Sequence, residues 1–578
     1  MEIVWDSKAI LGGKTTDAII AAVKEQVKGF KESWEKMQNP TPQELFDFIK
    51  QYESIGVELG NVGIHFELKF TEDSTDQHVL AEISKLKQLD AQLDEDLLPF
   101  SLWLKNLPQE KANEYIEAEE LSRYKHYLKH VREYVPHIRS EEVEKILSLH
   151  SITGSGAFSS LYTIITSGYT YDFQGKIVTE EELRSFVKDK DPAIRESAYT
   201  LLLEKYGKES TILFELYKNI VLEWKNSCKI RSYPSPIAIR NLGNEVNEKA
   251  VNALLSVVRK NVSVFQEYFK LKFKMNGEAY DYSRVHLYAP YANDVHKEYS
   301  YEDSKEIVLQ TYKEFSEEFY THAKEIFDKN MVHAFPKKNK RGGAYCMCTH
   351  PNMPPYVMLN HTGKLNDLFT MMHEFGHGIH DQLARVQTPM YYHATLPMAE
   401  TASIFGEMLL SQKLLNESPD DNIKKAILMD LLDGQYASIG RQSYFVIFEK
   451  EAHEMIANGA TKGDLEKRWM ELLHEQFGDM KIPDFFKNEW NYIPHIHHTP
   501  FYCYAYAWGN LLVLALYAMY KDQGSDFVPK MTKLLASGSS DYPLELLSSI
   551  GIDATSEEFW QKGFDIIKEE MEELKKLA

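Results

Sequence analysis

The sequence predicts a mostly α-helical protein with a small β region near its functional site. Over most of the chain, apolar residues recur at intervals of three and four, as on one face of a helix. The period changes to two in residues 162–178 and again in residues 344–360, as in strands. With 578 residues, of which 43% are hydrophobic and 26% charged, the chain can bury a large core, which excludes disorder as its main state.

The amino-terminal part predicts a succession of helices. Residues 17–37 show helical spacing of apolar residues, and similar patterns run through residues 42–104 and on to about residue 149. Between residues 162 and 178, aromatic and β-branched residues alternate on both sides of a glycine in the segment 172–176. This alternation predicts a β-hairpin.

Further helices are expected in the middle and at the end of the chain. Asp191 suits a helix N-cap and Pro192 a first turn, and helices are expected to resume at Asn247 and Tyr301. Residues 336–341 are basic and polar and predict an exposed loop. Strands are expected at 344–348 and 355–360, and residues 366–577 are expected to be helical almost throughout.

Charge and cysteine content narrow the function classes. The net charge of −21 argues against a nucleic-acid partner, because phosphate backbones attract basic surfaces. Four cysteines are too few for a disulfide framework, and residues 1–14 lack the basic and apolar pattern of a signal peptide. The expected location is therefore the cytoplasm.

One segment has the length and composition of a membrane-spanning helix. Residues 501–520 are apolar or aromatic apart from Gly509 and Asn510, and they are long enough to cross a bilayer. Three tyrosine hydroxyls and the central Asn510 amide would need buried partners there. We therefore expect a buried helix of a large core and no membrane partner.

Residues 373–377 read His-Glu-Phe-Gly-His and match the pattern H-E-x-x-H. On a helix, His377 lies about 40° round from His373 and one turn further along, so both imidazoles can bind one ion. Zinc accepts imidazole ligands and keeps a position for water in catalytic sites. Glu374 stands beside the first ligand and could accept a proton from that water. Taken alone, the pattern also fits a solvated helix with two histidines by chance.

An apolar stripe supports this helix independently of the motif. Its members are centred about 140° away from the histidines. They are Leu368, Met372, Phe375, Ile379 and Leu383. One face of the helix is therefore expected to pack while the other faces a site.

A third metal ligand is expected, and three residues compete for this position. Glu400 is favoured, because 23 positions after His377 the chain can have turned and returned on a second helix. His393 and Glu407 are the rivals. Glu407 is seven residues further on the same face as Glu400, so it is also the candidate for supporting a ligand from behind.

Other metal patterns in the sequence are weaker. The metzincin pattern requires a third histidine at position 383, where this chain has Leu383. His380 lies about 10 Å along the helix axis from His373, which is too far for both to bind one ion. Three residues near the second strand region have a spacing of two, but no fourth ligand follows them: Cys346, Cys348 and His350. A second metal site is not expected.

The sequence resembles a known family. Residues 373–377, followed by Met-Ala-Glu-Thr-Ala-Ser-Ile-Phe-Gly-Glu-Met-Leu-Leu at 398–410, are similar to the oligoendopeptidase F group of the thimet oligopeptidase family of zinc metallopeptidases. The similarity continues at 342–346 and 355–363, and also at 191–206 and 231–236. It covers the chain from roughly residue 154 to the carboxyl end.

The resemblance implies a two-lobed helical fold with a deep substrate channel and a zinc site at its floor. It implies an endopeptidase that hydrolyses internal bonds of short, unfolded oligopeptides with one Zn²⁺ per chain. The expected regions are an N-terminal helical region at 1–110, an oligoendopeptidase F-type N-terminal lobe with the hairpin at 111–200, and a catalytic zinc-peptidase region at 201–578.

Members of this family carry a histidine and several tyrosines on a late segment, where they stabilise the transition state. His495 and Tyr506 match best, and Tyr502 is preferred over Tyr504 because it lies one helical turn from Tyr506. Phenol and imidazole groups can donate hydrogen bonds to the oxygen that gains negative charge. The alternative is that these tyrosines pack in the core with their hydroxyls bonded to backbone.

The strand region offers a place for substrate. The resemblance and the glycines make Gly343, Ala344 and Tyr345 the expected substrate-binding residues. An extended peptide could pair with this backbone as an added strand, and Gly342 and Gly343 would allow close approach. A plain glycine turn is the alternative.

The sequence thus predicts a cytoplasmic zinc metalloendopeptidase. Glu374 is expected to act first as a general base and then as a proton donor to the leaving amine. Oligopeptides are the expected partners, and the oligomeric state is not predicted. Two rivals are a helical binding protein that keeps the fold without catalysis and a zinc esterase or amidase that ignores peptides.

Overall fold

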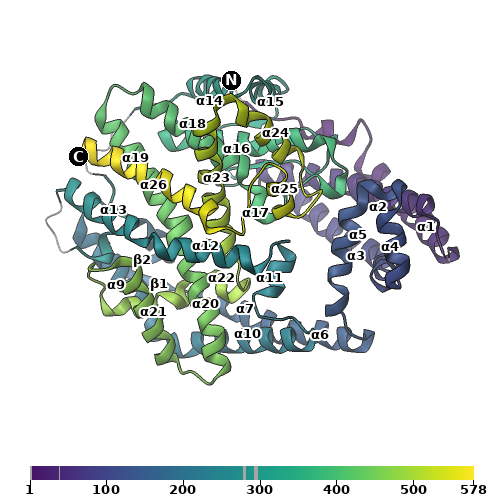
Figure 1. Cartoon of the computed structure of the whole chain (residues 1–578), viewed down its shortest axis with the longest axis horizontal. Coiled ribbons are helices and arrows are strands. Elements are labelled where there is room, and N and C mark those ends of the chain that lie inside the picture. The colour runs from purple at the N-terminus through teal and green to yellow at the C-terminus, as the bar shows by residue number, and fades with distance from the viewer. Residues whose placement is uncertain (1–2, 38, 278–281, 292–296) are drawn as a thin grey trace. The chain divides into compact units, whose positions relative to one another are not determined.

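The computed structural model describes residues 3–37, 39–277, 282–291 and 297–578. The protein is mostly helical, as predicted, and the described residues include five short strands (Figure 1). The chain forms two compact units of three segments each. The first unit comprises Met1–Val135, His296–Lys413 and Tyr520–Gly551, and the second comprises Pro136–Val295, Leu414–Met519 and Ile552–Ala578.

The first unit opens with long helices that pack on each other. Their ends follow local signals: Thr41 caps α2 in a capping box with Glu44, and Asp76 caps α3. Edge-to-face ring pairs, such as Phe30 with Phe100, fill the core between these helices. The helices are α1 (Thr16–Lys36), α2 (Pro42–Glu72), α3 (Gln77–Asn106), α4 (Gln109–Glu117) and α5 (Lys125–Glu133).

The same unit contains the helices that carry the metal motif. The helix α16 packs against α14, α15 and α24 (Figure 1). It also packs against two strands of a small sheet. These elements are α14 (Tyr301–Phe315), α15 (Glu317–Asp328), α16 (Leu365–Leu383), α17 (Leu396–Ala399), α18 (Thr401–Glu417), α24 (Val528–Ala536) and α25 (Pro543–Ser548). The helix predicted to begin at Tyr301 does so, and residues 336–341 form the predicted, largely exposed loop.

A three-stranded sheet lies beside α16. The strands β3 (Val332–His333), β4 (Tyr345–Met347) and β5 (Tyr356–Met358) have the order β3-β5-β4. The central strand β5 is fully buried and pairs in parallel with β3 and antiparallel with β4, with Cys346 opposite Val357. The predicted second strand region is thus confirmed, and β4 is an edge strand.

The predicted hairpin is confirmed only in its second half. Strands β1 (Thr170–Phe173) and β2 (Lys176–Thr179) pair antiparallel around a turn at Gln174 and Gly175, both with positive φ. Residues 162–167, which were expected to be strand, form the last part of helix α7 (Ser155–Ser167). Tertiary packing overrides the β propensity there, because the buried Tyr162 hydroxyl donates a hydrogen bond to the Asn491 carbonyl at 3.0 Å.

The second unit is a helical bundle. Asp191 is the N-cap of α9, as predicted, and accepts a hydrogen bond from Ala193. A helix was expected to resume at Asn247, which is the N-cap of α12 and accepts a hydrogen bond from Ala250. Besides α7, its helices include α6 (Glu141–Thr153), α8 (Glu180–Phe186), α9 (Pro192–Lys208), α10 (Ser210–Ile230), α11 (Ala238–Gly243), α12 (Glu248–Lys260), α13 (Val262–Met275), α19 (Asp421–Gln435), α20 (Gln442–Ala457), α21 (Lys462–Phe477), α22 (Pro494–His498), α23 (Tyr504–Gln523) and α26 (Glu557–Leu577).

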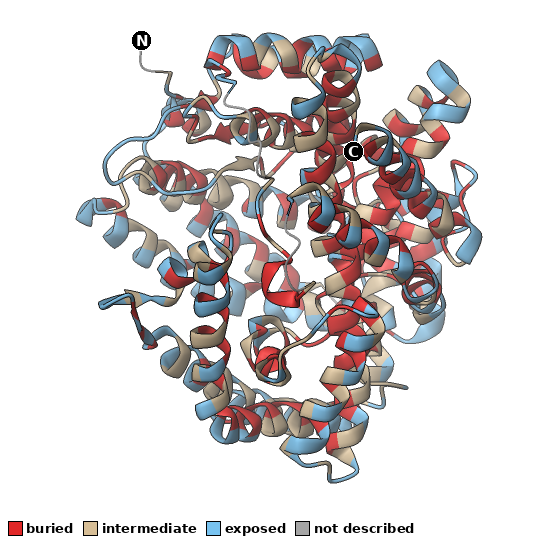
Figure 2. Cartoon of the chain, turned by 90° about the vertical axis from the view of Figure 1, so that its left-hand side faces the viewer, coloured by how far each residue is buried: buried red, intermediate tan, exposed pale blue. Residues whose placement is uncertain are grey.

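The apolar segment near residue 510 is the buried helix α23. Its side chains fill the core, with Trp508, Leu512 and Leu516 fully buried, and Figure 2 shows such buried positions in red along packed helix faces. Within the part of the chain that the structure describes, no helix combines the length and the hydropathy needed to cross a bilayer.

Candidate active site

Helix α16 presents the H-E-x-x-H residues on one side and packs with the other. All five members of the predicted apolar stripe are buried, and Phe375 stacks on Phe327 with ring centroids 4.2 Å apart. At the N-terminus, Asp367 accepts hydrogen bonds from the backbone N–H groups of Thr362 and Lys364. The helix is therefore fixed at its start and along its length, as a rigid metal site requires.

Gly376 lets the next helix approach the metal motif. A Cβ atom at this position would lie only 2.5 Å from the Cα of Ser403 and 2.7 Å from the carbonyl oxygen of Ala402. Only glycine allows so close a contact between α16 and α18 without a shift of backbone. This contact brings Glu400, the residue just before α18, to the histidines.

The three predicted metal ligands lie together. The Nε2 atoms of His373 and His377 are each 3.3 Å from Oε2 of Glu400. All three donor atoms lie within 4.8 Å of one another. Two donors that bind one zinc ion at tetrahedral angles and typical distances lie about 3.3 Å apart, so this set of two imidazoles and one carboxylate fits zinc.

Two neighbouring residues contact these predicted ligands. Glu407 contacts Nδ1 of His373, the ring nitrogen that faces away from the proposed ion, and Ser403 donates a hydrogen bond to Glu400 Oε2 at 2.7 Å. Burial by itself would raise the pKa of Glu400, but the hydrogen bonds from His373 and His377 outweigh it and hold that pKa low. Glu407, the candidate for supporting a ligand from behind, is thus in contact with His373, and its supporting role stays a prediction.

The rival third ligands lie elsewhere. His393 Nδ1 is 3.9 Å from Asp381 Oδ1, and within the described residues the only group with metal-ligand geometry is the one formed by His373, His377 and Glu400. His380 is buried, and burial lowers its pKa to about 4. The nearby thiol Cys348 bonds to Tyr392, and His350 Nε2 contacts Asn61 at 2.8 Å.

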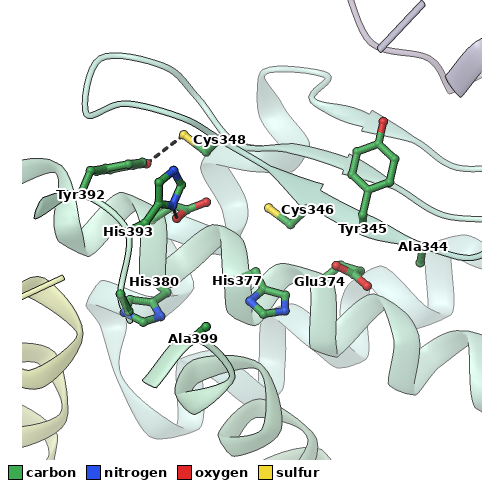
Figure 3. A pocket seen from close by; sticks show the side chains of 12 residues that line it. Ala344, Tyr345, Cys346, Cys348, Glu374, His377, His380, Tyr392, His393 and Ala399 are labelled. Atoms are coloured by element: carbon green, nitrogen blue, oxygen red, sulfur yellow. Dashed lines mark hydrogen bonds and ion pairs between the residues drawn. The ribbon is translucent and has the colours of Figure 1, made fainter. Parts of the chain in front are cut away.

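Glu374 faces a pocket beside the metal ligands. It is buried, and this desolvation raises the pKa of its carboxyl group. Figure 3 shows Glu374 and His377 on α16 below Cys346 of β4. The pocket has a volume of about 300 Å³. The twelve residues that line it are Ala344, Tyr345, Cys346, Cys348, Glu374, His377, His380, Asp381, Tyr392, His393, Ala394 and Ala399.

The predicted substrate strand lies along this pocket, but its three residues differ in accessibility. Gly343 has φ +81°, and a Cβ atom there would meet nothing within 4 Å. Ala344 lines the pocket. The Tyr345 hydroxyl bonds to Thr71 at 2.8 Å, and Figure 3 shows it pointing away from Glu374. The backbone of β4, and not the Tyr345 hydroxyl, is therefore the part available to a substrate.

The residues predicted on the late segment belong to the second unit, where three of them form one cluster. His495 stacks on Tyr502, and Tyr506 stands at right angles to both rings. His495 Nε2 lies 3.3 Å from the Tyr506 hydroxyl. Tyr504 is fully buried and accepts a hydrogen bond from Asn244 at 2.8 Å. Tyr502 precedes α23, so it does not lie one helical turn from Tyr506 as expected, and its preference over Tyr504 stays a prediction.

The turn at Pro500 and Phe501, next to this cluster, is held by hydrogen bonds. Phe501 has φ +59°, which is unusual for a residue with a side chain, and its N–H donates to buried Glu449 at 2.9 Å. Burial raises the pKa of Glu449 to about 8. Arg240 donates to the neighbouring Pro500 carbonyl at 3.1 Å. These contacts from α11 and α20 fix the turn that precedes α23.

Sequence reasoning missed several residues that shape the site. Asp381 lies one helical turn after His377 on the ligand face, so the same periodicity that paired the histidines could have found it. Ser403 and Glu449 carry no such signal, because each acts on a residue brought near by packing.

Comparison with known proteins identifies the family. The sequence profile of Peptidase family M3 matches residues 185–566, well over half of the chain, and that of Oligopeptidase F matches residues 103–171. The chain is 27% identical to Oligopeptidase PepF of Bacillus subtilis over 82% of its length and 72% of that protein. It is also 27% identical to an Oligoendopeptidase F homolog of Borreliella burgdorferi, over 96% of this chain and 95% of that one.

Solved structures share the fold. The crystal structure of oligoendopeptidase-F from Enterococcus faecium superposes with a TM-score of 0.72 at 20% identity, and the match covers 97% of this chain and 98% of that one. Since the family match includes all three members of the His-His-Glu group, this protein belongs to Peptidase family M3 and is a metallo-oligopeptidase.

Proposed function

We propose that the protein is a zinc-dependent endopeptidase that hydrolyses internal bonds of short, unfolded oligopeptides. The observation that carries the proposal is that Glu400 Oε2 lies 3.3 Å from the Nε2 atoms of both His373 and His377, beside Glu374 and an edge strand. All four cysteines are free thiols, which supports a cytoplasmic location. The Oligoendopeptidase F homologs also support the choice of oligopeptides as substrates.

Each residue of the first unit has a distinct task in this proposal. Zinc, when bound, supplies a Lewis acid that acidifies a water molecule and polarises the scissile carbonyl. Glu374 accepts a proton from the attacking water and then transfers it to the leaving amine. Glu407 holds His373 with its Nε2 atom toward the ion. Ser403 holds the carboxylate of Glu400 in place through a hydrogen bond to Oε2.

The substrate backbone is proposed to lie along β4. This strand has β5 on one side only, so its other edge can pair with an extended peptide. A peptide bound there would pass directly over the pocket that contains Glu374. Strand pairing explains how one site can accept many sequences, because main-chain hydrogen bonds are common to all peptides.

Purified protein is expected to hold about one zinc ion per chain and to lose activity reversibly in excess chelator. The single His-His-Glu group of the described residues offers three donors to one ion. Elemental analysis with a quenched-peptide assay measures both quantities. Two tightly held ions per chain, or full activity in chelator, would contradict the single-site proposal.

Peptides of about 5–20 residues are expected to be cleaved internally, whereas a stably folded protein is not. Strand pairing with β4 requires an extended substrate, and unfolding a domain costs about 5–15 kcal/mol, which nothing in the proposed site supplies. A length series of one peptide sequence and a folded protein, read by mass spectrometry, tests this. Efficient cuts in the folded protein would refute the requirement for an extended substrate.

His495 and Tyr506 are proposed to donate hydrogen bonds to the carbonyl oxygen as it gains negative charge. His495→Ala and Tyr506→Phe are expected to lower kcat by about 10²–10³-fold with little change in KM, since that charge exists only in the transition state. The buried Tyr504→Phe is the matched control and removes only the hydrogen bond with Asn244. A pure KM effect of the first two variants would reassign them to substrate positioning.

A further inference from the structure

The pocket beside Glu374 extends past the metal ligands and contains a second acid. Its lining includes the carboxyl groups of Glu374 and Asp381, three histidines and no lysine or arginine among the residues described there. Glu374 has a task in the proposed reaction, whereas Asp381 has none. Asp381 is therefore the group that calls for an explanation.

Asp381 lies one helical turn beyond the predicted metal ligand His377. It follows His377 by four residues on α16, so it is about 6 Å further along the helix axis and about 40° round from it. Its side chain is 17% exposed, and this exposed part lines the pocket. The carboxyl group is thus deep in the protein but reachable from the side where a substrate would be bound.

Two polar groups of the pocket bond to each other. Cys348 Sγ and the Tyr392 hydroxyl lie 2.8 Å apart and form the hydrogen bond drawn in Figure 3. Asp381 has no such bond: among the described residues its nearest basic atom is His393 Nδ1, at 3.9 Å. Arg385, in the 3-10 turn Ala384–Val386 that follows α16, pairs with Glu325 at 3.5 Å, and its charge attracts Asp381 only from beyond ion-pair distance. A buried carboxylate without a close cation is unfavourable, and a ligand that brings one relieves this cost.

A lysine or arginine side chain fits the space. The four-carbon stem of lysine spans about 6 Å, the same length as the helix rise from His377 to Asp381. A residue flanking a scissile bond at the proposed metal site would therefore place its cationic end near Asp381. Ala344, Ala394 and Ala399 leave room for the apolar stem, and the 300 Å³ volume accommodates one such side chain.

We propose that this pocket is a subsite for a lysine or arginine side chain next to the scissile bond, and that Asp381 determines this specificity. The inference rests on the proposed peptidase function and adds the class of side chain to it. The main-chain contacts along β4 do not depend on the substrate sequence, while the pocket selects the side chain at one substrate position.

The first test uses the unaltered enzyme. A peptide with lysine at one position flanking the cleaved bond is compared with the same peptide carrying leucine, glutamate or N-acetyl-lysine there, and the set is repeated for the other flanking position. At one of the two positions, kcat/KM for lysine is expected to exceed that for N-acetyl-lysine at least about tenfold, because acetylation removes the charge and keeps the stem. Equal values at both positions would overturn the proposal.

The second test uses variants. Asp381→Asn is expected to reduce the lysine to N-acetyl-lysine ratio to within about threefold of unity. Asp328→Asn is the matched control, because it removes one negative charge from an exposed residue of α15 in the same unit. It should keep the wild-type ratio. A ratio that falls equally in both variants would indicate long-range attraction by the net charge of −21 and would overturn the assignment of Asp381.

These outcomes separate the subsite from the activity on which it rests. If no peptide of the set is cleaved in the presence of zinc, the proposed function itself is wrong. If peptides are cleaved with a preference for leucine, or for no residue, only the subsite is wrong. The comparison of lysine with N-acetyl-lysine needs no variant, so it decides the question even if Asp381→Asn does not fold.

Discussion

Glu374→Gln is expected to lower kcat/KM for a short peptide by at least about 10²-fold while zinc stays at about one ion per chain. The amide keeps the shape of the side chain but cannot accept a proton from water. Zinc is retained because His373, His377 and Glu400, and not Glu374, form the donor set. Steady-state kinetics combined with elemental analysis of the same preparation measures both expectations.

The control for this substitution is Glu314→Gln. Glu314 is an exposed residue of α14 that pairs with Lys413 in the same unit, and it lies outside the pocket lining. Its variant should retain wild-type kinetics. If Glu374→Gln were nearly as active as wild type, another residue would have to activate the water. If it lost zinc as well as activity, Glu374 would instead contribute to the integrity of the metal site.

The metal helix could be predicted from the sequence because its information is local. The spacing of His373 and His377 and the apolar stripe on the other side follow from the helical repeat alone, and the structure confirms both. The position of Glu400 is not local information, because the 23-residue spacing from His377 does not indicate that the two helices contact each other. The contact depends on Gly376, whose missing side chain admits the backbone of α18.

Errors and omissions arose where packing decides the outcome. Residues 162–167 alternate as a strand would, yet they form helix because Tyr162 packs against the histidine segment and bonds to Asn491. Glu449 and Phe501 lie 52 residues apart, so their contact leaves no trace in local patterns. Asp381 is different, since its place on the ligand face was readable from helical periodicity.

The choice of third ligand can be tested with its two rivals as matched variants. Glu400→Ala is expected to lose zinc, with less than about 0.1 ion per chain after dialysis, and to lose activity with it. Its carboxylate lies 3.3 Å from both histidine nitrogens, so its removal leaves only two protein donors. Two imidazoles alone are fewer than the three protein ligands of a typical catalytic zinc site.

The rivals should behave differently from Glu400 and from each other. Glu407→Gln keeps the three donors but weakens the contact that orients His373, so zinc affinity should fall by about 10–100-fold without complete loss. His393→Ala should keep zinc, because His393 lies against Asp381 and outside the donor set. Zinc affinities from competition with a chromogenic chelator rank the variants. The opposite result would be complete loss of zinc in His393→Ala and retention of zinc in Glu400→Ala. It would identify His393 as the third ligand and show that the proximity of Glu400 to the histidines does not reflect metal binding.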